Sequence, residues 1–244
     1  MPSFFINFTQ GDKILDVYGE EYHHIHRVFR YTLDDEIKII NGKGLYAKAK
    51  ITEISKKYLR LELIDYKYFN KSEIKTACAF SLLKNKHDLL IIEKLTELGV
   101  SDLFPLSTRY SVKQSNDNTV DKFEKIAISA VKQCDNPYLP KVHNVKKLED
   151  SIKLIIENGY IPLVASEIEK EKYLSDYLNK GKAGNYCILI GPEGGFHEEE
   201  FNLFERLNIS QFCLGNHILR AETAAITAVS QLVAFNLIND KNWF

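Results

Sequence analysis

One stretch near the carboxy terminus constrains the fold more than any other part of the sequence. Residues 187–225 read CILIGPEGGFHEEEFNLFERLNISQFCLGNHILRAETAA. An apolar run leads into a glycine turn and a helix that starts with acidic residues, and a second short apolar run leads into another glycine turn and helix. A strand, a glycine loop and a helix, repeated at once, are typical of an α/β protein that lines a ligand crevice at the carboxyl ends of its strands.

The glycines of these two turns are Gly191, Gly194, Gly195 and Gly215. Each can adopt positive φ and lets bare backbone approach a ligand, and Pro192 restricts the first turn. Ordinary strand-to-helix turns would explain one such loop, but two loops with Arg220 directly behind the second favour a binding site. The phosphate motifs G-x-x-x-x-G-K-[ST] and G-x-G-x-x-G are both missing from the sequence. The loops are therefore predicted to recognise a ligand through backbone groups, and that ligand is not a polyphosphate.

The segments GPEGGF and LGNHILRAETA closely resemble the RsmE family, the 16S rRNA (uracil(1498)-N(3))-methyltransferases of the SPOUT (trefoil-knot) superfamily. The segments HHIHRVFR, NGKG and KLTELGV are similar to the same family, so the resemblance covers almost the whole chain. It implies an enzyme that uses S-adenosyl-L-methionine to methylate N3 of U1498 in the 16S rRNA of the small ribosomal subunit. It also implies that the protein is a homodimer and that its chain is knotted. The spacing of residues in the sequence does not itself predict a knot.

Composition agrees with a soluble globular protein, at 45% hydrophobic and 27% charged residues. With 32 Lys and Arg against 33 Asp and Glu the formal net charge is −1, so an RNA partner requires a local basic patch. We expect no signal peptide and, because no apolar segment of 18 residues is evident, no membrane span. The scattered cysteines predict free thiols in a reducing cytoplasm, and no residue cluster predicts a metal site: Cys78, Cys134, Cys187 and Cys213.

The hydrophobic pattern changes near residue 70. Residues 1–70 hold short alternating segments with tight turns, which predict a compact β-barrel. In residues 71–244, an apolar run at Ile74–Leu83, a helix at Leu89–Leu98 and a strand at Val100–Leu106 predict parallel α/β organisation. With the resemblance, the expected fold is a SPOUT-type trefoil-knotted α/β methyltransferase domain preceded by a small PUA-like β-barrel domain that binds RNA.

A basic helix is expected at Glu20–Arg30. His24 and Arg27, like Arg27 and Arg30, are three residues apart and would share a polar face. From spacing alone, a solvated helix face and a phosphate-contacting face are equally supported. A histidine metal site is less favoured, since no cysteine or carboxylate cluster completes it. The resemblance favours contact with RNA.

The resemblance adds two RNA-contact candidates. Arg109 is the one residue that matches a family ERS triplet here, although a surface residue at a strand end would look the same. Gln133 matches a family segment Glu-Gln-Ser/Cys-x-Arg, in which this chain has Lys132 for the Glu and Asn136 for the Arg. Lys132 or Lys141 is the alternative source of the missing cation.

The resemblance also implies which residues bind the cofactor. Backbone groups of both glycine loops would hold its adenosine and methionine parts, with Ile190 and Leu219 as apolar walls. The loop after the strand predicted at Tyr160–Ala165 would border it. The predicted cofactor-binding residues are Ala165, Ser166, Ile190, Gly191, Pro192, Glu193, Gly194, Gly195, Leu214, Gly215, Asn216, Ile218, Leu219, Arg220, Thr223 and Ala224.

Methylation of uracil N3 requires in-line approach of the methyl sulfonium, loss of the imide proton and stabilisation of charge on O2 and O4. Arg220 is predicted to stabilise those oxygens or position a phosphate; a salt bridge to Glu222 or Glu193 is the alternative. Glu193 is predicted to accept the imide proton or bind the cofactor, or else to order its loop, so the general base stays unassigned. His197 stands where the family often has a Ser or Thr N-cap, which predicts a weaker helix start.

Other functions remain open. A different SPOUT specificity, such as ribose 2′-O or guanine N1 methylation, is the nearest rival. An RNA-binding knot protein without catalysis is a second, given Lys132 and Asn136. A nucleotide-binding enzyme is disfavoured because the phosphate motifs are missing.

Overall fold

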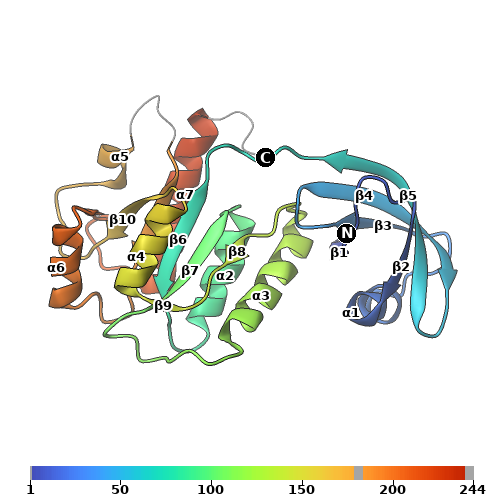
Figure 1. Ribbon diagram of the computed structural model, residues 1–244, viewed down its shortest axis with the longest axis horizontal. Coiled ribbons are helices and arrows are strands. Elements are labelled where there is room, and N and C mark those ends of the chain that lie inside the picture. The colour runs from blue at the N-terminus through green and yellow to red at the C-terminus, as the bar shows by residue number, and fades with distance from the viewer. Residues whose placement is uncertain (1, 179–183, 240–244) are drawn as a thin grey trace. The chain divides into compact units, whose positions relative to one another are not determined.

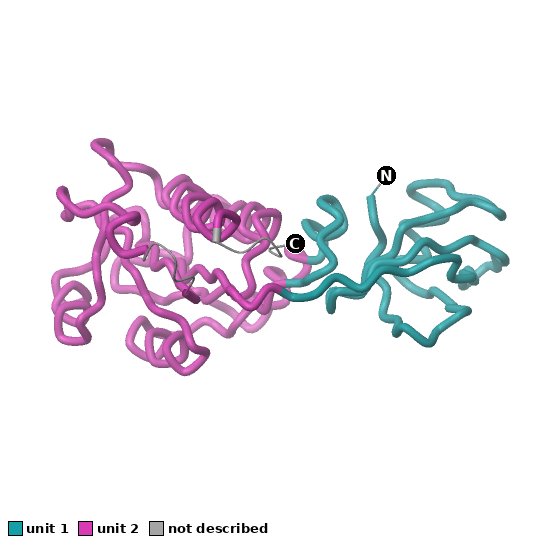
Figure 2. The backbone as a smooth tube through the Cα atoms, turned by 90° about the horizontal axis from the view of Figure 1, so that it is seen from above, with its two compact units in different colours: residues 1–71, 128–139, 244 teal, residues 72–127, 140–243 magenta. Residues whose placement is uncertain are grey.

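The computed structural model describes residues 2–178 and 184–239, and the chain forms two compact units (Figure 2). The first unit contains residues 2–71 together with residues 128–139. The second contains residues 72–127 and the described residues from 140 onward. Separate clusters of buried side chains form in the two units.

The first unit is built on a five-stranded sheet with the order β1-β3-β4-β5-β2. The pair β1–β3 is parallel and the other pairs are antiparallel. Alternate residues of β4 are buried, as a strand with one face on a core requires. The strands are β1 (Ser3–Phe5), β2 (Ile14–Tyr18), β3 (Glu36–Ile40), β4 (Leu45–Ile54) and β5 (Tyr58–Tyr68).

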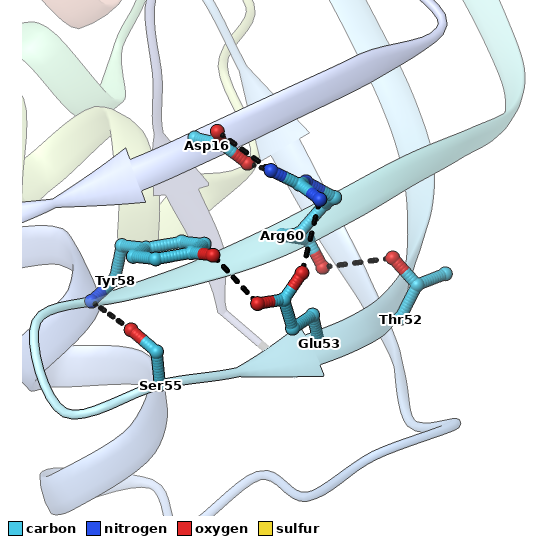
Figure 3. A network of polar contacts seen from close by, with 6 residues as sticks. All are labelled: Asp16, Thr52, Glu53, Ser55, Tyr58 and Arg60. Carbon is cyan, nitrogen blue, oxygen red and sulfur yellow. Dashed lines mark hydrogen bonds and ion pairs between the residues drawn. The ribbon is translucent and has the colours of Figure 1, made fainter.

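Arg60 links three strands of this sheet (Figure 3). Its guanidinium donates to both carboxylate oxygens of Asp16 at 2.7 and 3.1 Å and to Glu53 at 2.9 Å. The hydroxyl of Tyr58 donates to the other oxygen of Glu53 at 2.6 Å. Hydrogen bonding to Asp16 holds the pKa of Arg60 above its usual range and lowers that of Asp16. Arg60 is therefore occupied by carboxylates of its own sheet.

The helix expected at Glu20–Arg30 has a different form. One short helix, α1 (Gly19–Tyr22), continues as a π-helix, η1 (His23–Val28). The N–H of Phe29 donates to the carbonyl of His24 at 2.9 Å, an i to i+5 bond. Arg30 lies outside the helix with φ of 60°. The prediction that Arg27 and Arg30 share one face of an α-helix is therefore wrong. Arg27 lies in a π-helix, whose turns hold more residues than those of an α-helix, and Arg30 lies beyond its end with a left-handed backbone conformation.

Residues 128–139 belong to the first unit and are held there by polar contacts. They comprise the last turns of α3 (Thr119–Cys134) and the segment after it. Asp135 accepts a hydrogen bond from Ser3 at 2.5 Å and pairs with Lys38 at 2.6 Å. Lys132 pairs with Glu21 at 2.5 Å. Lys132 is thus bound to a carboxylate of its own unit, and the idea that it supplies a free cation for RNA is not supported.

The second unit is a parallel sheet with the order β12-β10-β11-β6-β7-β8, and β9 also pairs with β7. The predicted α/β class is confirmed, although the two-residue strands β8 and β9 were not expected. The strands are β6 (Thr76–Ser81), β7 (Asp102–Ser107), β8 (Lys141–Val142), β9 (Lys146–Lys147), β10 (Ile161–Ala165), β11 (Tyr186–Ile190) and β12 (Ser210–Phe212). The other helices are α2 (His87–Glu97), α4 (Leu148–Glu157), α5 (Leu174–Tyr177), α6 (Glu198–Arg206) and α7 (Ala221–Asn239).

Helices pack on the sheet of the second unit. Helix α4 lies against β7 and β10 (Figure 1), while α7 lies against β6 and β11. Every residue of β11 is buried, as its continuous apolar run predicts for a strand covered on two faces. Cys78, Cys187 and Cys213 are buried free thiols and Cys134 is an exposed one, as expected. Burial raises the pKa of Cys78 and Cys187, which keeps these two thiols protonated.

Helix α7 is more apolar than the sequence analysis allowed. Its residues Ala221–Ile238 have a mean hydropathy of 1.3 over 18 residues, so the expectation that no apolar segment of this length exists is wrong. Of this window, 44% is buried inside the protein. Its buried residues include Ala225, Ala228 and Leu232, and the helix packs on β6, β11 and α2. These contacts are those of a core helix of the second unit.

Candidate functional site

A cavity of about 1100 Å³ opens in the second unit. Its lining comes from the loops that follow β6, β7, β10, β11 and β12. Because these strands are parallel, their carboxyl ends lie at one edge of the sheet, and loops far apart in the sequence converge there. The cavity therefore occupies the edge at which an α/β fold binds its ligand.

The glycine-rich loop after β11, residues 191–195, lines one side of the cavity. Gly195 has φ of +72°, and a Cβ at this position would lie 2.1 Å from Oε1 of Glu167. Gly191 has no positive φ, and a Cβ there would meet the ring of Phe196 at 3.2 Å. Gly194 has no positive φ either. Gly191 and Gly194 therefore do not use the positive φ that glycine permits; close packing against Phe196 is what favours glycine at Gly191.

The loop after β12 brings Arg220 to the cavity. Gly215 in this loop has φ of +135° and open space around its Cα. The carbonyl of Arg220 accepts a bond from the N–H of Ala224 at 2.8 Å, so helix α7 begins immediately after the arginine. The Arg220 side chain is exposed and forms no ion pair within the described part of the chain. The alternative salt bridge to Glu222 or Glu193 is not found.

Glu193 joins two loops of the cavity. Its Oε1 accepts a hydrogen bond from the backbone N–H of Lys84 at 3.1 Å. The glycine loop after β11 is thereby tied to the loop after β6. This contact is the loop-ordering role considered for Glu193, and it leaves the second carboxylate oxygen available for other partners.

A second acidic residue of the cavity is deeply buried. Glu222 is 8% exposed, and its Oε1 lies 3.2 Å from Nδ1 of His87, at the start of α2. Its Oε2 is buried and has no hydrogen-bond partner among the described residues. A buried carboxylate oxygen without a partner is costly, and such groups concentrate where a ligand supplies the missing donor or a proton is exchanged.

The loop after β7 is anchored to the start of α6. The N–H of Arg109 donates to Oε1 of Glu200 at 3.0 Å, and its guanidinium pairs with Glu199 at 2.5 Å. The ring of the next residue, Tyr110, meets that of His197 edge-on at 5.3 Å. Arg109 is therefore held by a carboxylate of its own unit, although its side chain is 56% exposed.

Helix α6 has a complete cap, contrary to the sequence-based expectation. Nδ1 of His197 accepts a bond from the N–H of Glu199 at 3.1 Å. The carboxylate of Glu200 accepts one from the N–H of His197 at 2.8 Å. The two contacts form a capping box in which an imidazole nitrogen replaces the usual hydroxyl oxygen, so the expected weakness at this helix start is not found.

Comparison with known proteins decides the family. Residues 70–233 match the model of the RNA methyltransferase domain, and residues 17–64 match that of the RNA methyltransferase PUA domain. The chain is 31% identical over 217 residues to ribosomal RNA small subunit methyltransferase E of Rickettsia conorii, covering 86% of each chain. The chain belongs to this RNA methyltransferase family.

Other relatives agree with this family in length and fold. Ribosomal RNA small subunit methyltransferase E of Bacillus subtilis is 28% identical over 245 residues, which cover 95% of this chain and 96% of the relative. The putative methyltransferase Lpg2936 of Legionella pneumophila, solved in complex with the cofactor SAM, is 25% identical with a TM-score of 0.82, over 94% of this chain and 95% of that one. The expectation of an α/β methyltransferase domain with an amino-terminal PUA-like domain is thereby confirmed.

Most of the predicted cofactor-binding residues of this RNA methyltransferase line the cavity. Asn216 and Thr223 do not, and both are exposed. The sequence analysis did not predict that the loop after β6 lines the cavity. Lys84 directly follows the apolar run predicted as a strand at Ile74–Leu83, just as the glycine loops directly follow their strands, and this position was the signal that could have indicated it. The other lining residues that were not predicted are Asn85, His87, Tyr110, Val112, Glu167, Glu169, Lys170, Cys213, His217, Ala221 and Glu222.

The predicted RNA-contact residues are divided between the two units. His24, Arg27, Arg30 and Gln133 belong to the first unit, and Arg109 belongs to the second. Arg27, Arg30 and Gln133 are exposed. His24 is half-buried, with Nδ1 3.3 Å from Nζ of Lys132. Arg27 and Arg30 are thus the exposed cations of this set that form no ion pair within the described part of the chain.

Proposed function

We propose that this chain is an S-adenosyl-L-methionine-dependent methyltransferase that methylates N3 of one uridine, U1498, in the 16S rRNA of the small ribosomal subunit. Its membership of the RNA methyltransferase family and its similarity to ribosomal RNA small subunit methyltransferase E support this activity. One structural observation supports the cavity of the second unit as the site of the proposed activity. Arg220 stands exposed and unpaired, as far as the described residues show, at a cavity whose walls are backbone loops at the ends of parallel strands.

The lining of the cavity fits S-adenosyl-L-methionine. Gly195 lets the carboxylate of Glu167 lie directly against the backbone of the loop after β11, so two loops of the cavity meet there, and a Cβ would push them apart. Backbone N–H and C=O groups of the loops after β11 and β12 suit the polar edges of an adenosine, and Ile190 and Leu219 offer apolar surface to its ring. When bound, this cofactor supplies an electrophilic methyl group on a sulfonium.

The remaining work falls to side chains of the chain itself. Arg220 is free to donate to the oxygens of a uracil as negative charge develops on them. A guanidinium suits this task because it presents several N–H donors in a fixed plane. Glu193 and Glu222 are carboxylates of the cavity that lie within reach of a bound ligand. Either can accept the imide proton directly, and Glu222 can also do so through His87.

We also infer how the rest of the chain serves this reaction. Residues 1–70 act as a PUA-like RNA-binding domain and residues 71–244 as the methyltransferase domain, with Arg27 and Arg30 as phosphate contacts. The order of β10, β11 and β6 and the return of α7 to β6 and β11 are compatible with a trefoil knot. Leu237 and Ile238, 40% and 80% exposed near the end of α7, support a homodimer interface. The enzyme works in the cytoplasm, where its RNA substrate is found.

Product analysis tests the proposed function. Purified protein is incubated with S-adenosyl-L-methionine and unmodified small-subunit RNA, and the nucleosides are identified by mass spectrometry. We expect N3-methyluridine at one position. Ribose-methylated or guanine-methylated product would replace the proposal with another specificity, and cofactor binding by calorimetry without any product would indicate an RNA-binding protein that lacks catalysis.

A further inference from the structure

We propose that Tyr110 is the surface on which the acceptor pyrimidine of an unpaired RNA segment stacks, an inference that rests on the proposed function. Tyr110 lines the cavity and is 49% exposed. Val112, 64% exposed, and Ile218, 84% exposed, line the same cavity. Aromatic and aliphatic side chains that stay exposed together at a cavity mark a ligand-binding surface.

The ring of Tyr110 is held in place without being covered. Its edge-on contact with His197 has an interplanar angle of 67°. A Cβ on Gly194 would lie 3.5 Å from Cβ of Tyr110, so the tyrosine stands next to the glycine loop. The preceding residue, Arg109, is anchored through its backbone to Glu200 at 3.0 Å. The ring is therefore oriented before any ligand arrives, and about half of its surface remains open.

The proposed reaction requires such a surface. N3 of uracil lies on the base-pairing edge, so the base must be unpaired and outside the stack before a methyl group reaches it. A base that leaves the stack loses contact with its neighbours, and an aromatic side chain restores part of that contact. Among the described residues that line the cavity, Tyr110 is the one with a benzene ring. The backbone loops are thereby left to the cofactor, and the tyrosine to the base.

Photocrosslinking tests this placement independently of methyl transfer. A short RNA with 5-iodouridine at the target position is mixed with the full-length protein and S-adenosylhomocysteine, irradiated and mapped by mass spectrometry. We expect the adduct on Tyr110 and its loss in the Tyr110→Ala variant. An adduct elsewhere, with Tyr110 unmodified, would overturn the inference. A failure of the proposed function would be seen in a different experiment, the product analysis above, in which the wild-type protein would give no methylated product.

Steady-state kinetics give a second test. Tyr110→Ala is expected to raise KM for RNA about 10-fold or more, and Tyr110→Phe to stay near wild type because it keeps the ring. The dissociation constant for S-adenosyl-L-methionine, measured by calorimetry, stays unchanged in both. Tyr173→Ala is the matched control, because Tyr173 is 46% exposed in the same unit but does not line the cavity. An unchanged KM for Tyr110→Ala, or an equal loss of cofactor binding, contradicts the inference.

Discussion

Nδ1 of His87 lies 3.2 Å from Oε1 of Glu222 at the wall of the cavity, and Oε2 of the same carboxylate is buried without a hydrogen-bond partner among the described residues. His87 is the first residue of α2 and Glu222 is the second residue of α7, so the pair joins the starts of two helices that also pack on each other. The first turn of a helix favours a carboxylate, but a buried Oε2 that lacks a donor opposes stability. Its position is explained if the reaction or the cofactor uses it.

Glu222→Gln separates these roles. The amide keeps the size of the side chain but loses the ion pair with His87 and the favourable position of a negative charge in the first turn of α7, so we expect the free energy of unfolding to fall by no more than about 1 kcal/mol. Methyl transfer should fall about 10-fold or more. Denaturant unfolding and initial rates measure the two effects. A large loss of stability with full activity would show that Glu222 is structural.

Arg220→Ala is expected to abolish methyl transfer and to preserve cofactor binding. The side chain is exposed and unpaired in the described part of the chain, so its removal leaves no buried partner behind, and stability should change by about 0.5 kcal/mol or less. Arg220→Lys should also be poorly active, since lysine lacks the planar pair of donors. Calorimetry with S-adenosyl-L-methionine is the control; retained activity of Arg220→Ala on small-subunit RNA would remove this role.

Gly195→Ala is expected to weaken cofactor binding and stability together. The residue has φ of +72°, and its new Cβ would lie 2.1 Å from the carboxylate of Glu167, which must move. The backbone strain alone costs about 1 kcal/mol. Gly11→Ala is a matched control, since no atom lies within 4 Å of its Cβ position and its φ is not positive. Equal cofactor affinity in the wild type and the Gly195 variant would show that the loop is not a cradle.

Acid should loosen the contact between residues 128–139 and the sheet of the first unit. Burial acts to raise the pKa of Asp135, but hydrogen bonds from Lys38 and Ser3 outweigh it, and the net pKa lies below the ordinary 3.8. A lowered pKa means that the stabilisation is complete above the unfolded-state value and is lost as the pH falls through the folded-state value.

Asp135→Asn measures this contact. Because the carboxylate side chain is 37% exposed, solvent screens the pair, and we expect a loss of only about 1 kcal/mol at neutral pH. The difference from wild type should shrink as the pH falls below the ordinary value of 3.8 and through the lower folded-state pKa. Asp34→Asn is the control, because Asp34 pairs with Lys50 but is 81% exposed. A pH-independent loss in Asp135→Asn would show that the ionised carboxylate is not what holds this contact, since asparagine tolerates the φ of 56° at this residue as well as aspartate does.

The main elements were predictable because their signals are local. The helix predicted at Leu89–Leu98 and the strand predicted at Tyr160–Ala165 lie close to the observed α2, His87–Glu97, and β10, Ile161–Ala165. The cavity walls from Gly191 to Gly195 were predictable for the same reason. The π-helix at His23–Val28 was not, since its hydrogen-bond pattern has no distinct spacing of apolar residues.

What the sequence could not supply was contact between distant segments. His87 and Glu222 are widely separated along the chain, and their approach depends on the order of β6, β11 and β12 in the sheet. The same holds for Lys132. Because this chain departs from the family pattern at that position, Lys132 was considered as a free cation, but it pairs with Glu21. The role of His197 as an N-cap was missed because imidazole is not among the usual capping groups.

The central claim is that two backbone loops hold a methyl donor and Arg220 directs its transfer to uracil N3. The most direct measurement is mass-spectrometric analysis of small-subunit RNA after incubation with S-adenosyl-L-methionine and either wild-type or Arg220→Ala protein. The account predicts N3-methyluridine at a single site with the wild type and none with the variant, while both bind the cofactor equally. Methylation at another atom by the wild type, or equal product from both proteins, would contradict it.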